Sequence, residues 1–306
     1  MTPPIHITFS SCLYRMKNRH GYEKHLNWFR DFIRVVNRFY LVIYTGEHEY
    51  ETICNEIRKL GGDTQGKIKV ILKPISEFHN YKYERFWMDN NARTECKLAE
   101  IADWRLNMMW CEKTHFVRET IENRYFDTEY YGWCDVGYFR DTLSSGSLST
   151  PAAPRAYRER IREHWPNPNI INRLHKDKVY YGCNISPEKL YKGYTYNAQH
   201  FQNTAKMDDA DTGIPRDLYH QGAHMLSGGF YITGREKALW WCCRFQEILE
   251  LYIMNNAVIQ DDQHIIAHCV FTTGGSMPAT NPDFCIIKIN ETNEDALWFL
   301  FRNFLL

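Results

Sequence analysis

The stretch "YYGWCDVGYFRD", residues 130–141, places a single acid, Asp135, among aromatic and small apolar side chains. The apolar run that leads to this acid is typical of a buried strand. A bare carboxylate in such surroundings is costly unless another group compensates its charge. We therefore expect Asp135 to pair with a basic side chain, to lie at an exposed strand end, or to hold a metal ion that binds substrate.

Strand and helix patterns alternate in the residues before this stretch. Short apolar runs at 5–9, 39–45 and 67–72 predict strands, and segments with helical spacing at 22–36 and 50–60 separate them. This order predicts an α/β fold with a mostly parallel central sheet that is flanked by helices on both faces.

Polar residues are expected at the edge of this sheet where ligands bind. In open parallel sheets the ligand lies beyond the carboxyl ends of the strands. The expected strand ends place Ser10, Ser11 and Thr45 at that edge. Ordinary loop polarity is the alternative explanation for these three residues.

A long helix is predicted over 98–121, just before the strand that ends at Asp135. Lys113 falls on its apolar stripe. A lysine in this position either extends along the core surface to reach water or carries its ammonium into a site that requires positive charge.

The second half of the chain contains two further segments of interest. The strand predicted at 225–233 is interrupted by Gly228 and Gly229, and a glycine pair inside a strand marks a bulge or a close approach of the backbone to a ligand. Residues 141–224, which separate it from the first half, are rich in Ser, Pro, Asn, Arg and Gly and are interpreted as loops on the working face.

The segment "DDQHIIAHC", residues 261–269, opens a predicted helix with two acids. Asp261 can cap this helix, and His264 and His268 lie on one helical face, as metal ligands often do. The metallopeptidase pattern H-E-x-x-H is not met, because Ile265 stands where the glutamate is needed. The alternative is a capping aspartate with two partly buried histidines.

Composition excludes some classes of function. Lys plus Arg and Asp plus Glu both total 37, so no net charge attracts nucleic acid or an acidic membrane. Neither a signal peptide nor an apolar segment long enough to span a membrane is recognised. The cysteines form no C-x-x-C pair, and we expect reduced thiols and a cytoplasmic location.

Three segments carry a resemblance to a known family. They are residues 110–140, 228–241 ("GGFYITGREKALWW") and 261–268. With the order of elements, they make the chain similar to GT-A glycosyltransferases, and more closely to the HtrL/YibB-like family. The resemblance implies one Rossmann-like domain over 1–306, with a nucleotide-binding half (1–140), a loop-rich insertion (141–224) and an acceptor and catalytic half (225–306).

The resemblance also implies a metal ion. GT-A enzymes commonly bind manganese through an Asp-x-Asp motif, and the ion bridges the diphosphate of the donor. This chain has Asp135-Val136-Gly137, so the second acid is missing. An outside ligand would then complete the site with Asp135, and His268 or His264 suits this role. Mn²⁺ is the ion expected, with Mg²⁺ as the alternative.

The implied reaction transfers a sugar from a nucleotide-sugar donor to a glycan, a protein-linked sugar or another hydroxyl acceptor. Asp262 is the candidate for the base or for the anion beside the anomeric carbon. Lys113 matches the family's lysine and would serve the phosphates or a structural ion pair. Gly228 and Gly229 would admit the donor sugar close to the backbone.

Two other interpretations compete with this one. The missing second acid is compatible with a carbohydrate- or nucleotide-sugar-binding protein that has lost turnover. The alternative for Asp135 itself is a structural ion pair with Lys113 or Arg140. A nucleotide-dependent methyltransferase is disfavoured, because no glycine-rich loop follows the first strand.

Overall fold

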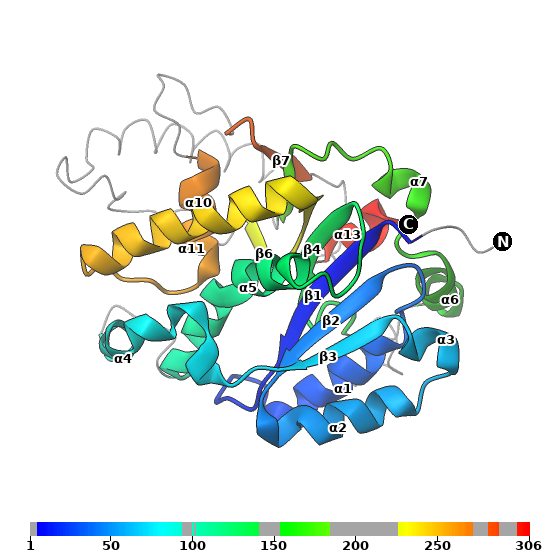
Figure 1. Cartoon of the computed structure of the whole chain (residues 1–306), viewed down its shortest axis with the longest axis horizontal. Coiled ribbons are helices and arrows are strands. Elements are labelled where there is room, and N and C mark those ends of the chain that lie inside the picture. Colours follow the sequence, from blue (N-terminus) through cyan, green and yellow to red (C-terminus); the bar gives the residue numbers. More distant parts are fainter. Residues whose placement is uncertain are drawn as a thin grey trace.

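The computed structural model describes residues 5–93, 100, 102–140, 154–183, 226–271, 281–287 and 299–306. Within these residues, seven strands form one sheet in the order β3-β2-β1-β4-β6-β5-β7 (Figure 1). The strands are β1 (Ile7–Leu13), β2 (Tyr40–Thr45), β3 (Ile68–Leu72), β4 (Tyr130–Cys134), β5 (Val179–Cys183), β6 (Leu226–Gly234) and β7 (Phe284–Ile287).

The sheet is mostly parallel. The pairs β1–β2, β2–β3, β1–β4 and β5–β7 are parallel, whereas β6 runs antiparallel to both of its neighbours, β4 and β5. The α/β architecture expected from the alternating pattern is therefore confirmed.

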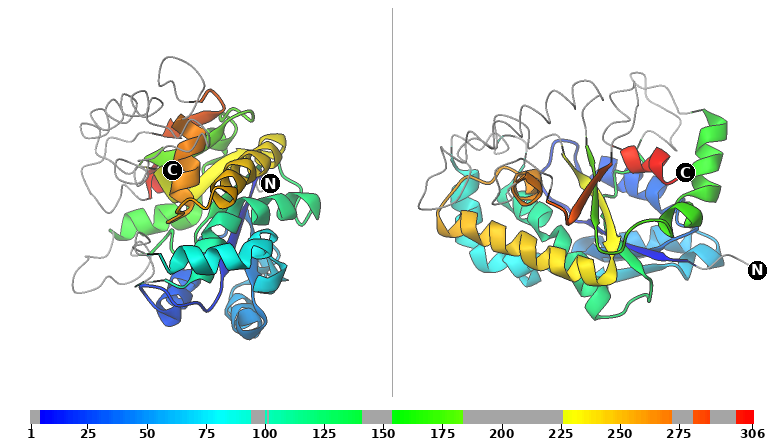
Figure 2. Two further views of the ribbon diagram at one scale, coloured as in Figure 1. Left: turned by 90° about the vertical axis from the view of Figure 1, so that its left-hand side faces the viewer. Right: turned by 90° about the horizontal axis from the view of Figure 1, so that it is seen from above.

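Helices cover both faces of the sheet (Figures 1 and 2). One face carries α1 (Tyr22–Ile33), α2 (Glu47–Arg58), α6 (Arg155–His164), α7 (Pro168–Ile171) and α13 (Leu300–Phe304). The other carries α4 (Glu84–Asn91), α5 (Trp104–Glu122), α10 (Arg235–Met254) and α11 (Asp262–Phe271). The connections contain the short α3 (Gly62–Gln65) and two 3₁₀ turns, η1 (Ile75–Glu77) and η2 (His79–Tyr83).

The alternation of side chains along the strands divides the core in two. On β4, Tyr130 and Cys134 pack with the α1 side, whereas Tyr131 and Trp133 pack with the α5 and α10 side. Successive side chains of a strand point to opposite faces, and both faces of this sheet are covered. This explains why the strand contains apolar residues without interruption.

The structure corrects the boundaries of two predicted elements. The first strand continues to Leu13, so Ser10 and Ser11 lie inside β1 instead of at its end. The long helix begins at Trp104, later than expected, because the Asp103 side chain accepts hydrogen bonds from the first free backbone N–H groups. Of the predicted loop-rich segment, residues 154–183 form α6, α7 and β5, and the remainder lies outside the described residues.

A membrane-spanning helix is not found among the residues that the structure describes: none of their helices has both the length and the apolar character required.

Candidate functional site

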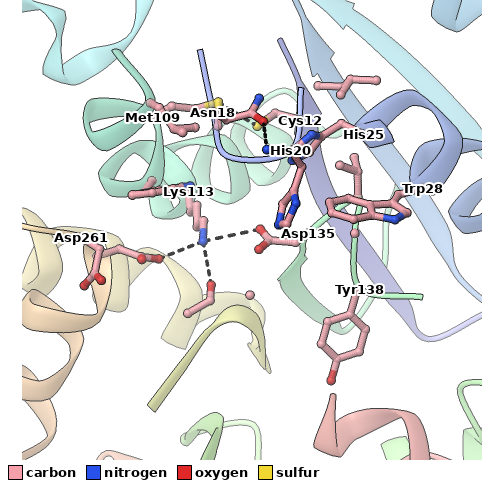
Figure 3. A pocket seen from close by; sticks show the side chains of 18 of the residues that line it. Cys12, Asn18, His20, His25, Trp28, Met109, Lys113, Asp135, Tyr138 and Asp261 are labelled. Carbon is pink, nitrogen blue, oxygen red and sulfur yellow. Dashed lines mark hydrogen bonds and ion pairs between the residues drawn. The ribbon is translucent and has the colours of Figure 1, made fainter. Parts of the chain in front are cut away.

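A cavity of about 360 Å³ opens at the edge of the sheet where β1 and β4 end (Figure 3). Because β6 is antiparallel, its amino-terminal residues reach the same edge. The cavity therefore lies where a parallel sheet is expected to bind its ligand, and its volume is in the range of small-molecule sites.

Lys113 of α5 occupies the inner wall of this cavity. Its Nζ donates to the Gly228 carbonyl at 2.9 Å and lies 2.9 Å from Asp262 Oδ2 and 3.5 Å from Asp135 Oδ1 (Figure 3). An ammonium has three donors, and these three oxygens match that number. The lysine is 7% exposed, so it does not extend to bulk water and instead carries its charge into the site.

Asp135 follows β4 and is held at the strand end by its backbone. Its N–H donates to the Gly229 carbonyl at 2.9 Å, and its Oδ1 accepts from Trp133 Nε1 at 2.6 Å. The side chain is 41% exposed, and it lines the cavity. Asp135 thus combines two of its expected roles: it pairs with a basic side chain, and it lies at an accessible strand end.

Asp262 is the first residue of α11, which Asp261 caps by accepting a hydrogen bond from the His264 N–H. The glycine at 228 is what lets the Asp262 carboxyl approach β6. A Cβ at Gly228 would lie 2.7 Å from Asp262 Oδ2, closer than such contacts allow. At Gly229 a Cβ would lie 3.0 Å from Asp135 Oδ2. The glycine pair therefore makes room for both carboxyl groups.

Burial and charge shift the titration of this cluster. Burial alone would lower the pKa of Lys113, but Asp135 and Asp262 outweigh it and hold that pKa above its ordinary value. Burial raises the pKa of Asp262 to about 7, against the opposing effect of the Lys113 ammonium. The site therefore contains a fixed cation beside a carboxyl group that titrates near neutral pH.

The structure brings together Lys113, Asp135, Gly228, Gly229 and Asp262, all of which line the cavity. Of the three hydroxyl residues expected with them, Thr45 ends β2 as expected, whereas Ser10 and Ser11 lie inside β1. None of the three reaches the cavity, and this part of the expectation is corrected. Ser10, Ser11 and Thr45 are fully buried and do not line the cavity. The Ser10 hydroxyl contacts the Thr120 hydroxyl at 2.8 Å, and Thr45 Oγ1 donates to the Leu13 carbonyl.

The described residues do not compose the metal site expected from Asp135 and His268. The His268 ring is buried with its Nδ1 3.2 Å from the Tyr252 hydroxyl, and neither it nor His264 lines the cavity. The Lys113 ammonium lies within 3.5 Å of both Asp135 and Asp262, and the divalent ion itself stays a prediction. Among the described residues, no cluster of three or more His, Cys, Asp or Glu side chains could hold a metal.

Sequence reasoning missed the basic side of the cavity. Arg19 and His20 line it from the segment between β1 and α1, His25 from α1, and Arg140 from the segment after β4. The indole of Trp28 lies among them (Figure 3). Basic residues are frequent from 15 to 25, directly after the first strand, and this was a signal that could have identified them.

Comparisons with known proteins find a likeness in chain arrangement. No protein-family model matches the chain, and no curated protein matches it. The chain is similar to mouse xyloside xylosyltransferase 1 in its apo form, with 12% identity, a TM-score of 0.43, and coverage of 92% of this chain and 85% of that one.

Two other solved structures show a similar likeness. Galactosyltransferase LgtC, in complex with donor and acceptor sugar analogs, has 11% identity and a TM-score of 0.43, with 91% of this chain and 72% of that one covered. A 4-diphosphocytidyl-2C-methyl-D-erythritol synthase from Anaerococcus prevotii has 10% identity and a TM-score of 0.36, with 97% and 98% covered. At this similarity no activity follows for this chain, and the HtrL/YibB-like resemblance stays a prediction.

Replacing Lys113 should test the contacts of its ammonium with Asp262, Asp135 and Gly228, which we call the clamp. We expect Lys113→Met to lower the free energy of unfolding by about 3–5 kcal/mol, because Asp262 then lies buried without its cation. The loss should be smaller at pH 5 than at pH 8, since Asp262 is protonated at the lower pH. Urea denaturation at both pH values measures it.

Asp135→Asn is the matched control for that variant, because the Asp135 carboxylate is partly exposed. Its cost should stay below that of Lys113→Met, because Lys113 keeps its contacts with Asp262 and Gly228. Equal losses for the two variants, or a loss for Lys113→Met that is the same at both pH values, would contradict the description of the clamp.

Gly228→Ala should displace the Asp262 carboxyl, because its Cβ falls within 3 Å of both carboxylate oxygens. We expect a loss of about 1–3 kcal/mol in unfolding free energy, measured by thermal and urea denaturation. The control is Gly62→Ala in α3, where a Cβ meets nothing within 4 Å. A Gly228→Ala protein as stable as the Gly62→Ala protein would show that no close approach exists.

Proposed function

We propose that this protein is a glycosyltransferase that moves a sugar from a nucleotide-sugar donor to a hydroxyl of a glycan or another acceptor. One observation carries the proposal: at the ligand-binding edge of an α/β sheet, a buried ammonium lies between two aspartates that line a cavity. The resemblance of residues 110–140, 228–241 and 261–268 to GT-A glycosyltransferases agrees with it.

The chemistry of transfer requires charges of both signs. The anomeric carbon becomes oxocarbenium-like as the glycosidic bond breaks, and the acceptor hydroxyl must lose a proton. Asp262 lines the cavity and accepts this proton, because its pKa of about 7 suits a base at neutral pH. Lys113 holds the Asp262 carboxyl in place at 2.9 Å and keeps a positive charge at the base of the cavity.

Trp110 gives the cavity a flat apolar surface. It lines the cavity and is partly exposed, whereas Tyr14 and Trp133 are buried in the wall behind it. A ring of this kind is suited to stack against a sugar or a nucleobase. It provides binding area for a donor, while Asp135 and Asp262 provide the polar groups that orient it.

A panel of nucleotide sugars tests the proposal directly. Each donor is incubated with the protein in manganese and, separately, in a chelator, and the release of nucleoside diphosphate and the melting temperature are measured. We expect at least one donor to raise the melting temperature and to be consumed. A melting shift without turnover for every donor would instead identify a binding protein, and the absence of both would refute the proposal.

Asp262→Asn should remove the base. We expect the rate of transfer to fall by about 10²–10⁴-fold, with donor affinity nearly unchanged. The wild-type rate should rise with pH through about 7, where the Asp262 carboxyl loses its proton, whereas the residual rate of the variant should not. Asp89→Asn on α4, an exposed acid paired with Arg85, is the control and should keep the wild-type profile.

A further inference from the structure

The basic side of the cavity is formed by side chains that pack around one indole. We call Arg19, His20, His25 and Arg140 the basic wall. All four line the cavity, and three of them surround one indole: the rings of His25 and His20 lie 4.7 and 5.1 Å from the ring of Trp28, and the Arg140 guanidinium lies 5.1 Å from it.

Backbone contacts hold the basic wall in position. Asn18 Oδ1 accepts hydrogen bonds from the N–H groups of His20 and Gly21 at 2.9 and 2.7 Å. Gly21 has φ of 76°, a left-handed conformation that favours glycine, and its carbonyl lies 2.9 Å from His25 Nδ1. The segment between β1 and α1 is therefore held by hydrogen bonds of its own.

Gly137 explains how Trp28 comes so close to the strand end. A Cβ at Gly137 would lie 3.1 Å from Cε3 of the indole, a tighter contact than side chains normally make. The glycine two residues after Asp135 thus lets the indole that supports the basic wall pack against the same turn that carries the acid.

The charges of the basic wall are crowded. Burial lowers the pKa of His20, and the cations Lys24, Arg140 and Arg19 lower it further. Burial also lowers the pKa of His25, with Arg140 and Lys24 acting in the same direction, and the Gly21 carbonyl and Asp135 opposing them. Within the described part of the chain, no acid forms an ion pair with Arg19 or Lys24. An anion placed here would relieve this repulsion.

The opposite side of the cavity does not offer a cation to an anionic ligand. Lys113 has its three donors directed at Gly228, Asp262 and Asp135, so none of them is left for a phosphate oxygen. The positive charge for a phosphorylated ligand must therefore come from another part of the cavity.

We propose that the basic wall binds the diphosphate of the donor, and that protein cations hold it without a divalent ion bridging to Asp135. This rests on the proposed function in so far as the donor is a nucleoside diphosphate sugar. The arrangement separates the two charges of the reaction: the departing diphosphate lies against Arg19 and Arg140, while the acceptor proton leaves toward Asp262.

Titration calorimetry with inorganic pyrophosphate in a chelating buffer tests this inference on the whole chain. We expect binding without metal, weaker at higher ionic strength, and weakened about tenfold or more by Arg19→Gln and by Arg140→Gln. Arg19 is exposed, so its variant should fold even if loss of Arg140 disturbs the rings beneath it. Arg155→Gln on α6, an exposed arginine paired with Glu159, is the control and should bind as the wild type does.

The outcomes separate this inference from the proposed function. Binding of pyrophosphate that requires manganese, or that is indifferent to both Arg19→Gln and Arg140→Gln, would overturn the inference while leaving sugar transfer possible. Metal-independent binding that these variants weaken, in a protein that consumes no nucleotide sugar, would support the basic wall and refute the transferase.

Discussion

The buried ammonium of Lys113 is the interaction on which the rest of the site depends. It joins four elements that are distant in sequence, since the lysine belongs to α5, Asp135 follows β4, Gly228 belongs to β6 and Asp262 begins α11. Two carboxyl groups this close would repel each other in a poorly solvated place. The cation between them compensates this repulsion. The strand β6 contributes the Gly228 carbonyl and, because Gly228 has no side chain, the space for the Asp262 carboxyl.

The cavity is consequently polarised. Its inner side carries carboxyl groups around the Lys113 ammonium. Its outer side, built on the segment between β1 and α1 and on α1 itself, carries basic groups around the Trp28 indole. A ligand with an anionic part and a neutral hydroxyl-bearing part fits this division. The fold produces it simply, because β1, β4 and the reversed β6 all present their ends at one edge.

Local sequence pattern predicted much of this architecture, and its failures have physical causes. The alternation of strands and helices predicted the sheet. Asp135 was recognisable as a single acid in an apolar run, Lys113 by its place on an apolar helical stripe, and Asp262 by the acidic start of a predicted helix and the family resemblance. The spacing of His264 and His268 was read correctly as one helical face, but which face meets the cavity depends on packing, and the Tyr252 hydroxyl contacts His268 elsewhere. The basic wall was missed because the sequence does not show on which side of the molecule a charged loop lies. That depends on contacts such as those of Asn18.

Ser10, which was expected at the cavity, has a structural role that affects the position of Lys113. The hydroxyl of Thr120 on α5 contacts those of Ser10 on β1 and Tyr44 on β2, at 2.8 and 2.9 Å. Thr120 lies about two helical turns from Lys113, so these buried contacts set the axial position of the whole helix against the sheet. A slip of one residue would move the helix by about 1.5 Å, enough to withdraw the ammonium from its acceptors. We therefore expect substitutions at Ser10, Tyr44 and Thr120 to be coupled to one another, because together they set the position of the Lys113 charge.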